Sequence, residues 1–272
     1  MEKMLIFPKN FWWGSAWSAE QSEGTGDTGK AETIWEHWFN KEPNRFYDRI
    51  GPGVTTDHFY RYKDDIKLMK ETGHNSFRLS LSWARLFPDG GTGEINRKAV
   101  DFYRDLMGEM IKNGIKPFIN LYHFDMPMKL QELGGWTSRE TVEAYVNYAV
   151  SCFKEFGDLG YHWFTSNEPL GPILGGYLED FHYPNLIDFK KGVQAAFYTI
   201  LAHAKAIKEF KKLNLKSKIG VILNLSPTYP RSQNKWDVEA AEIADVFYTR
   251  RFLDPMVKGT FNKKLVSILE EY

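Results

Sequence analysis

Residues Ser76–Trp83 have the sequence SFRLSLSW, in which apolar and polar side chains alternate. This alternation predicts a β-strand with two different faces. Leu79 and Leu81 lie on the apolar face, which we expect helices to cover. Arg78 lies on the other face with the serines, and a charge there needs surroundings that tolerate it. The lumen of a barrel that opens into an active site provides them, whereas the middle of an open sheet does not.

Four other segments have the composition of short buried strands. Each is rich in aromatic or branched residues and is bounded by glycine, proline or polar residues. These segments are Phe11–Trp17, Lys116–His123, Tyr161–Glu168 and Lys218–Ser226. Together with Ser76–Trp83 they give five predicted strands.

Amphipathic helical patterns lie between the predicted strands. Asn96 precedes one of them as a predicted N-cap, and Gly114 closes it. Thr137 and Glu140 form a predicted capping box before another. The predicted helices are Asp57–Thr72, Arg97–Lys112, the segment from the capping box to about Phe156, Asp188–Leu213 and Asp237–Phe252.

The order strand, helix, strand predicts an α/β fold with parallel strands and right-handed crossovers. No linker composition divides the chain, so residues 1–272 are predicted to form a single domain. Two architectures compete, a doubly wound open sheet and a (β/α)8 TIM barrel. We expect no G-x-G-x-x-G or Walker-type phosphate loop after any predicted strand, which weakens an open-sheet nucleotide enzyme. We therefore favour the barrel.

The composition excludes several classes of partner. Lysine plus arginine and aspartate plus glutamate both number 35, so bulk charge favours neither nucleic acid nor an anionic membrane. The chain has no apolar run that approaches a membrane span and no signal-peptide pattern at its start. The lone Cys152 excludes an internal disulfide, and we expect a cytoplasmic protein. The histidines lack metal-ligand spacing, so we expect no metal and no cofactor.

Barrel enzymes carry their reactive groups at the carboxyl ends of the strands. Glu168 ends the fourth strand, and the neighbouring Trp163 and Phe164 would favour its protonated form, as a general acid requires. The alternative is a strand-end glutamate that only binds a loop backbone. Asn167 and Glu168 should point to opposite faces, so they share a site only if the strand breaks or bulges there.

Three other residues are candidates for the same site. Arg78 on the lumen face is costly unless it pairs with a carboxylate, although that pair could be structural. His123 ends the third strand and could orient a substrate hydroxyl, donate a proton or pack as a neutral ring. Gln21 lies just past the first strand. A serine or cysteine nucleophile is not expected, because no G-x-S-x-G motif occurs and Cys152 falls within a predicted helix.

Several long motifs, in the right order, resemble those of glycoside hydrolase family 1. Thr165–Pro169 is similar to its T-x-N-E-P signature, and Phe7–Gly14 with Ala19–Gly24, Asn75–Pro88 and Tyr122–Pro127 resemble its first three strands and their ends. Phe124 stands where many members have tryptophan. This variant, Gly175–Pro184 and Leu223–Pro227 resemble the bacterial 6-phospho-β-glucosidase branch, which hydrolyses phosphorylated β-glucosides delivered by sugar-import phosphotransferase systems.

The resemblance implies a retaining hydrolase of 6-phospho-β-D-glucosides that uses two glutamates. Glu168 would match the general acid/base, and Arg78 the arginine that holds the nucleophile ionised. Asn167 would match the ligand of the sugar 2-hydroxyl, and Gln21 and His123 the ligands of other glycone hydroxyls. Retention requires a second carboxylate about 5–5.5 Å from the first. The family carries it in an E-N-G motif on the seventh strand, and its phosphate-binding residues also follow the last strand predicted here.

No E-N-G motif occurs in these 272 residues, and five strands do not close an eight-stranded barrel. We expect an incomplete, truncated barrel that is inactive by itself and self-associates through exposed sheet edges. Asp125 and Glu179 are the nearest substitutes for the nucleophile by sequence, and neither matches it. The alternatives are a β-glucosidase, a 6-phospho-β-galactosidase and a non-catalytic sugar-binding half-barrel.

Overall fold

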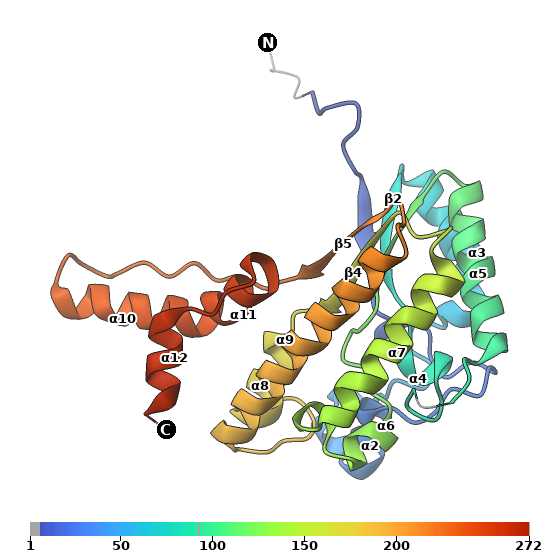
Figure 1. Ribbon diagram of the computed structural model, residues 1–272. Helices are drawn as coiled ribbons and strands as arrows, with labels where there is room; N and C mark the ends of the chain where they lie inside the picture. Colours follow the sequence, from blue (N-terminus) through green and yellow to red (C-terminus); the bar gives the residue numbers. More distant parts are fainter. Residues whose placement is uncertain (1–5, 92, 272) are drawn as a thin grey trace.

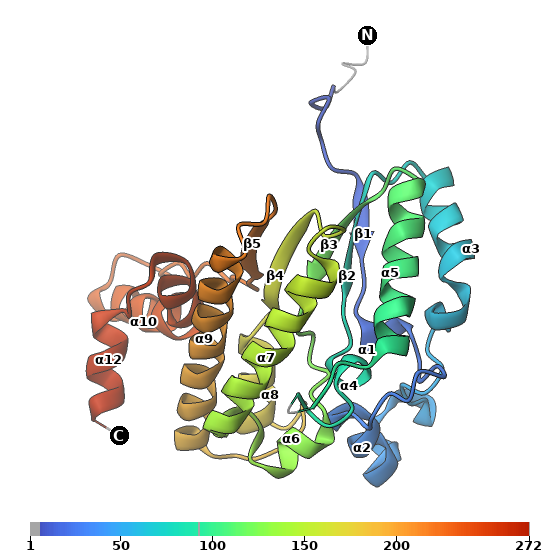
Figure 2. The same ribbon diagram turned by 45° about the vertical axis from the view of Figure 1, so that its right-hand side comes forward.

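The computed structural model describes residues 6–91 and 93–271. Its centre is a sheet of five parallel strands that follow one another in chain order (Figures 1 and 2). Neighbouring strands are hydrogen-bonded, with Arg78 opposite Phe118 and Ile119 opposite Trp163. The strands are β1 (Gly14–Ala16), β2 (Ser76–Ser80), β3 (Lys116–Asn120), β4 (His162–Asn167) and β5 (Lys218–Ile222).

Long helices connect successive strands and cover one face of the sheet (Figure 2). They are α3 (His58–Glu71) before β2, α5 (Arg97–Lys112) before β3, α7 (Arg139–Phe156) before β4 and α9 (Phe189–Lys212) before β5. Their apolar faces contribute much of the core. Each strand and the helix beside it form one βα unit, which is the repeat of a parallel barrel.

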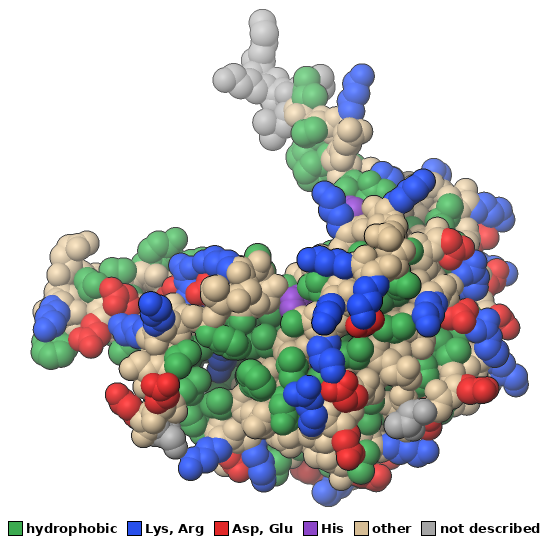
Figure 3. All heavy atoms as spheres, viewed as in Figure 1, with side chains coloured by type: hydrophobic (Ala, Val, Ile, Leu, Met, Phe, Trp, Pro, Cys, Tyr) green, Lys and Arg blue, Asp and Glu red, His purple; other side chains and the backbone are tan. Residues whose placement is uncertain are grey.

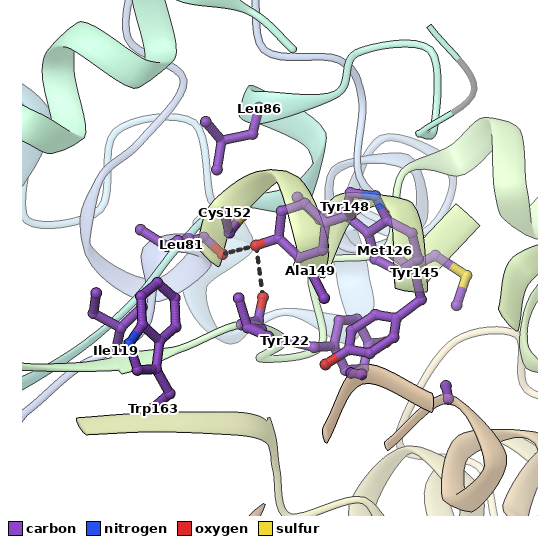
Figure 4. Packing of buried hydrophobic residues seen from close by; sticks show 14 of the residues in the cluster. Leu81, Leu86, Ile119, Tyr122, Met126, Tyr145, Tyr148, Ala149, Cys152 and Trp163 are labelled. Atoms are coloured by element: carbon purple, nitrogen blue, oxygen red, sulfur yellow. Dashed lines mark hydrogen bonds between the residues drawn. The ribbon is translucent and has the colours of Figure 1, made fainter. Parts of the chain in front are cut away.

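The core lies between the sheet and these helices. Leu79, Ile119 and Trp163 project from successive strands into it and are each at most 2% exposed. Figure 4 shows this packing around Tyr148 of α7, whose hydroxyl donates to the carbonyl of Leu121 at 2.8 Å. Arg78 projects to the opposite face and is half-buried, so the predicted alternation in the second strand is confirmed.

Short helices gather at the carboxyl ends of the strands, away from the N-terminus (Figure 1). They are α1 (Ala19–Ser22), α2 (Ile34–Lys41), α4 (Trp83–Leu86), α6 (Met128–Glu132) and α8 (Leu170–Tyr177), with the 3-10 helices η1 (Pro43–Arg45), η2 (Tyr47–Arg49) and η3 (Gly135–Thr137). The candidate residues lie at this end.

The segment after β5 extends away from the sheet (Figure 1). It comprises α10 (Lys235–Asp245), the π-helical turn η4 (Val246–Arg250), α11 (Arg251–Leu253), a second π-helical turn η5 (Asp254–Lys258) and α12 (Lys263–Glu270). Apolar side chains gather on the face shown in Figure 3, where this segment meets the body. A hollow there is lined by Phe189, Phe197, Phe261 and Leu265 among others.

The two outer strands of the sheet are each paired on one side only. Among the described residues, β1 pairs with β2 and β5 pairs with β4, and no pairing joins β1 to β5. The sheet is therefore open, with two free edges.

The helix before β4 begins one residue later than predicted. Its N-cap is Ser138, whose hydroxyl accepts from the backbone N–H of Glu140 at 3.2 Å. The Thr137 hydroxyl instead donates to the carbonyl of Gly134 and closes η3. The predicted capping box of Thr137 and Glu140 is wrong because this preceding turn takes up the threonine side chain.

The second strand is also shorter than predicted, since β2 ends at Ser80. Ser82 leaves the sheet and caps α4, where its hydroxyl accepts from the backbone N–H of Arg85.

Candidate active site

The end of β4 is irregular at the predicted acid/base residue. Between the pairs Phe164–Gly220 and Asn167–Ile222, β4 advances one residue more than β5, which is a β-bulge. Glu168 follows with a φ of 41°, in the left-handed region that non-glycine residues rarely adopt. Its backbone N–H donates to the carbonyl of Ile222 at 2.9 Å. The break that would let Asn167 and Glu168 share a site is therefore present.

Arg78 connects this strand end to β2. Its Nη1 donates to Oδ1 of Asn167 at 2.8 Å. Partial burial lowers the pKa of Arg78, and the negative charge of Glu168 acts in the opposite direction. Arg78 thus lies within electrostatic reach of Glu168, while its direct hydrogen bond goes to an amide. The prediction that Arg78 pairs with the nucleophile stays a prediction, because its observed hydrogen-bond acceptor is Asn167 and the charge that acts on it is that of Glu168.

His123 lies just beyond β3 and is 9% exposed. Burial lowers its pKa to about 4, and the positive charge of Arg78 contributes to this shift. The neutral ring is therefore favoured at pH 7, a form that suits hydrogen bonding to a hydroxyl better than proton donation. It packs edge-on against Phe124 with 4.9 Å between ring centroids. Its buried Nδ1 has no hydrogen-bond partner among the described residues.

Gln21 lies in α1, the short helix that follows the carboxyl end of β1. The hydroxyl of Ser18 donates to its side-chain oxygen at 2.7 Å and caps the same helix. The backbone N–H of Ala19 donates to the hydroxyl of Ser80 at 2.7 Å, which ties α1 to β2. Gln21 and His123 both line a cavity of about 380 Å³. Its other walls include Ser18, Glu20, Trp35, Phe46, Ile50, Pro52 and Phe124.

The five predicted site residues form two neighbouring groups. Gln21 and His123 share the cavity, whereas Arg78, Asn167 and Glu168 form a cluster that does not line it. Arg78 belongs to both neighbourhoods because its charge also acts on His123. The sheet thus brings residues from four strand ends toward one region.

Asp125 and Glu179, named above as the nearest substitutes for the nucleophile, do not belong to the group of Arg78, Asn167 and Glu168. Asp125 is fully buried, and its carboxylate accepts from the backbone N–H groups of Trp83 at 2.9 Å and His123 at 3.3 Å. Burial raises the pKa of Asp125 to about 6. This carboxylate holds the turn after β3. Glu179 is exposed beyond the end of α8.

Sequence reasoning overlooked a buried ionic cluster beside the cavity. Glu20 is 7% exposed and accepts from the Thr33 hydroxyl at 2.7 Å and from Lys30 at 3.4 Å. Lys30 also pairs with Glu36 at 3.0 Å. The pattern T-x-x-E at Thr33–Glu36 was a readable signal, because it forms a complete capping box at the start of α2. That helix also places Trp35 on the cavity wall.

A second overlooked pattern is Gly24–Lys30, whose sequence GTGDTGK has the glycine spacing of a phosphate-binding loop. In the structure this segment follows α1 and not a strand, and it does not open a helix. Lys30 is held by two carboxylates. The context that a nucleotide site requires is absent here.

Two further observations concern the residues that the structure describes. They contain no group of three or more His, Cys, Asp or Glu side chains placed to hold a metal ion. Within the same residues, every helix is too short or too polar to cross a membrane.

Known proteins match this chain along nearly its whole length. The glycosyl hydrolase family 1 model matches residues 3–272. The 6-phospho-beta-glucosidase GmuD of Bacillus subtilis is 58% identical over 265 residues, which cover 97% of this chain and 57% of that protein. Beta-glucosidase A of Acetivibrio thermocellus is 41% identical over 268 residues, which cover 98% of this chain and 59% of that protein. The chain thus spans less than two thirds of the length of these relatives.

The structural comparison agrees with the sequence comparison. The crystal structure of the psychrophilic beta-glucosidase BglU from Micrococcus antarcticus is similar with a TM-score of 0.91 at 37% identity, over 97% of this chain and 56% of that one. The predicted fold class, the first five βα units of a (β/α)8 barrel, is confirmed. The chain belongs to glycosyl hydrolase family 1.

Proposed function

We propose that this chain supplies the acid/base half of a retaining glycosidase site for 6-phospho-β-D-glucosides. The observation that carries the proposal is the end of β4, where a bulge and a left-handed residue bring Asn167 and Glu168 together beside Arg78. Backbone strain of this kind persists where the surrounding structure enforces it, and it concentrates at functional sites. A carboxyl at the end of a barrel strand has the position of a catalytic residue.

The proposed roles follow from the chemistry of each side chain. Glu168 protonates the leaving oxygen and later removes a proton from water. Asn167 binds the sugar 2-hydroxyl through its amide N–H, because its carbonyl oxygen is already taken by Arg78. Arg78 supplies the positive charge that keeps a nearby carboxylate ionised. Gln21 and the neutral His123 bind other glycone hydroxyls, and the unpaired Nδ1 of His123 suits such a contact.

The second carboxylate is proposed to lie outside residues 1–272, so that this chain alone does not turn over substrate. Asp125 is committed to two backbone N–H groups and Glu179 is exposed, so neither meets the fixed separation that retention needs. We also propose that the residues form one domain. Its two free edges and its apolar surface then favour self-association of the isolated chain.

A phosphorylated substrate is favoured by the name of the more similar curated relative, a 6-phospho-beta-glucosidase. We accordingly place the reaction in the cytoplasm, with no nucleic-acid or membrane partner and no cofactor. A β-glucosidase acting on unphosphorylated substrates is the second candidate, since Beta-glucosidase A is 41% identical.

Two experiments test the proposal. The purified chain is first incubated with p-nitrophenyl β-glucoside 6-phosphate beside the Glu168→Gln variant, and no release is expected from either. Release that is lost in the variant would show that a second carboxylate is available within this chain or a neighbouring copy. The chain is then fused to the part of GmuD that it does not cover, and turnover of glucoside 6-phosphate is expected in this fusion but not in its Glu168→Gln variant. A fusion that stays inactive, or a variant that keeps full activity, would contradict the proposal. Equal turnover of the plain glucoside, although the family's phosphate-binding residues would lie in the GmuD part, would favour the second candidate.

A further inference from the structure

The side chain of Glu20 is buried next to Gln21, which the proposed function places in the sugar site. Both residues belong to the four-residue helix α1 and both line the cavity. The Glu20 carboxylate is buried, and it accepts hydrogen bonds from the hydroxyl of Thr33 at 2.7 Å and from the ammonium group of Lys30 at 3.4 Å. These two partners come from the loop before α2 and its N-cap. The carboxylate therefore fixes α1 against a second wall of the cavity.

The ionisable groups around Glu20 carry more negative charge than positive charge. The groups that act on it are the carboxylates of Glu36 and Asp125 and the ammonium group of Lys30. The side chain of Lys30 is 3% exposed and that of Glu36 is 15% exposed, while Asp125 is fully buried. The nearby guanidinium of Arg85 is already paired with Glu23 at 3.0 Å. Among the described residues, the three carboxylates thus share a single available cation, Lys30. Because buried negative charges that are not neutralised disfavour ionisation, one of these carboxyl groups should bind a proton readily.

Burial raises the pKa of Glu20 to about 7, and the attraction of Lys30 opposes this shift. Burial alone would lower the pKa of Lys30, but the neighbouring Glu20 and Glu36 carboxylates raise it more, so the ammonium group stays charged. Asp125 has a pKa of about 6 and two backbone donors. Glu20 is therefore the member of the cluster that gains a proton first as the pH falls through neutrality.

We propose that Glu20 is a positioning residue of the sugar site, whose ionised carboxylate holds Gln21 in place for glycone binding and whose protonation releases it. The ionised form accepts two hydrogen bonds, one of them from a cation, and such bonds are stronger than neutral ones. The protonated form competes poorly with Glu36 for Lys30, so α1 loses its tie to the loop. This inference rests on the proposed function, because it assigns Gln21 to the sugar.

The first test follows Gln21 itself by NMR, without sugar. The backbone and side-chain amide signals of Gln21 are recorded from pH 5.5 to pH 8.5 in the wild-type chain, Glu20→Gln and Glu36→Gln. We expect the wild-type signals to shift with a midpoint near pH 7 and the Glu20→Gln signals to lack this midpoint, with at most a smaller change at lower pH from Asp125. Glu36→Gln removes a charge that raises the pKa of Glu20 but keeps the acceptor of the capping box. Its midpoint should therefore move to lower pH.

The second test measures the affinity for methyl β-D-glucoside by calorimetry, because this ligand has no group that titrates in the range. If only the ionised form binds well, the affinity should fall roughly tenfold from pH 8 to pH 6, as the ionised fraction falls from about 0.9 to about 0.1. Glu20→Gln should bind weakly at both values, and Glu20→Asp should recover part of the dependence.

The outcomes separate the inference from the function on which it rests. Gln21 signals that do not respond to pH, or that respond equally in Glu20→Gln, would overturn the inference whatever the sugar does. Absence of methyl β-D-glucoside binding at every pH, with the Gln21 signals still titrating, would show that the isolated chain has no sugar site of its own and would leave the coupling between Glu20 and Gln21 standing.

Discussion

The guanidinium of Arg78 on β2 donates a hydrogen bond of 2.8 Å to the side-chain oxygen of Asn167 at the end of β4, across 89 positions of sequence. Strand β3 lies between these two strands, so the bond passes over the face of the sheet that the helices do not cover. It fixes the strand end that carries Glu168. The site therefore depends on the parallel order of the strands and not on any single motif.

Removal of Arg78 should destabilise the chain by unpairing Asn167. The amide oxygen of Asn167 is in a residue only 3% exposed, and a buried acceptor without its donor costs about 1–3 kcal/mol. We expect Arg78→Met to lower the free energy of unfolding by that amount in urea titrations. Arg61→Met, which removes an exposed arginine of α3, is the matched control and should change it by less than about 0.5 kcal/mol. Equal losses in both variants would contradict the assignment.

The left-handed backbone of Glu168 predicts an unusual ranking of substitutions. Glycine adopts a φ of 41° without penalty, whereas alanine pays roughly 1 kcal/mol or more there. Glu168→Gly should therefore be more stable than Glu168→Ala, although both lose the carboxylate and only alanine keeps a Cβ atom. At Lys208, an exposed position in α9, alanine should instead be more stable than glycine by about 1 kcal/mol. Thermal unfolding of the four variants measures the stability difference between glycine and alanine at each site. If alanine is the more stable residue at both sites, the backbone of Glu168 is not strained.

The pKa of His123 predicts a loss of stability in acid. Because the folded-state pKa of about 4 lies below the unfolded value of about 6.5, this histidine stabilises the fold above pH 6.5. That contribution is lost as the pH falls from 6.5 toward 4. Between pH 6.5 and pH 5 it amounts to about 2 kcal/mol.

His123→Gln should reduce the fall in unfolding free energy over this interval by that amount. An identical pH dependence in the His123 variant and the wild type would show that the ring is not held neutral.

The buried pair of Glu23 and Arg85 should be the strongest ionic contribution at the end of α1, the helix that carries Gln21. Arg85 is 0% exposed and also donates to the carbonyls of Gly24 and Thr25. Loss of one partner leaves a buried charge uncompensated, so Glu23→Gln should cost about 3–5 kcal/mol in chemical unfolding. Glu143→Gln on the surface of α7 breaks two exposed pairs, with Arg139 and Lys205, and should cost less than about 1 kcal/mol. Comparable costs would contradict the buried pair.

Features that depend on neighbouring residues in the sequence were predicted accurately, whereas features that depend on contacts between distant segments were not. The helix Arg97–Lys112 is predicted with the bounds that it has, because its N-cap and apolar stripe are local signals. The cap before β4 was misplaced by one residue because the turn that occupies Thr137 depends on Gly134. Asn167 and Glu168 were found from their place at a strand end, whereas their common orientation required the bulge.

Glu20 was missed for a physical reason. Its partners Lys30 and Thr33 lie 10 and 13 positions further along the chain, and they contact Glu20 only through the fold of the loop between α1 and α2. The residues next to Glu20 in the sequence therefore do not predict these contacts.

The central claim is that Glu168 is the general acid of a retaining site completed by residues beyond this chain. The most direct test uses the fusion with the part of GmuD that this chain does not cover. Hydrolysis of methyl and 2,4-dinitrophenyl β-glucoside 6-phosphate is compared between the fusion and its Glu168→Gln variant. Protonation matters for the poor methanol leaving group, so that rate should fall about 10²- to 10⁴-fold, while formation of the glycosyl-enzyme from the dinitrophenyl substrate should change far less. Equal losses on both substrates would contradict the assignment of Glu168 as the acid.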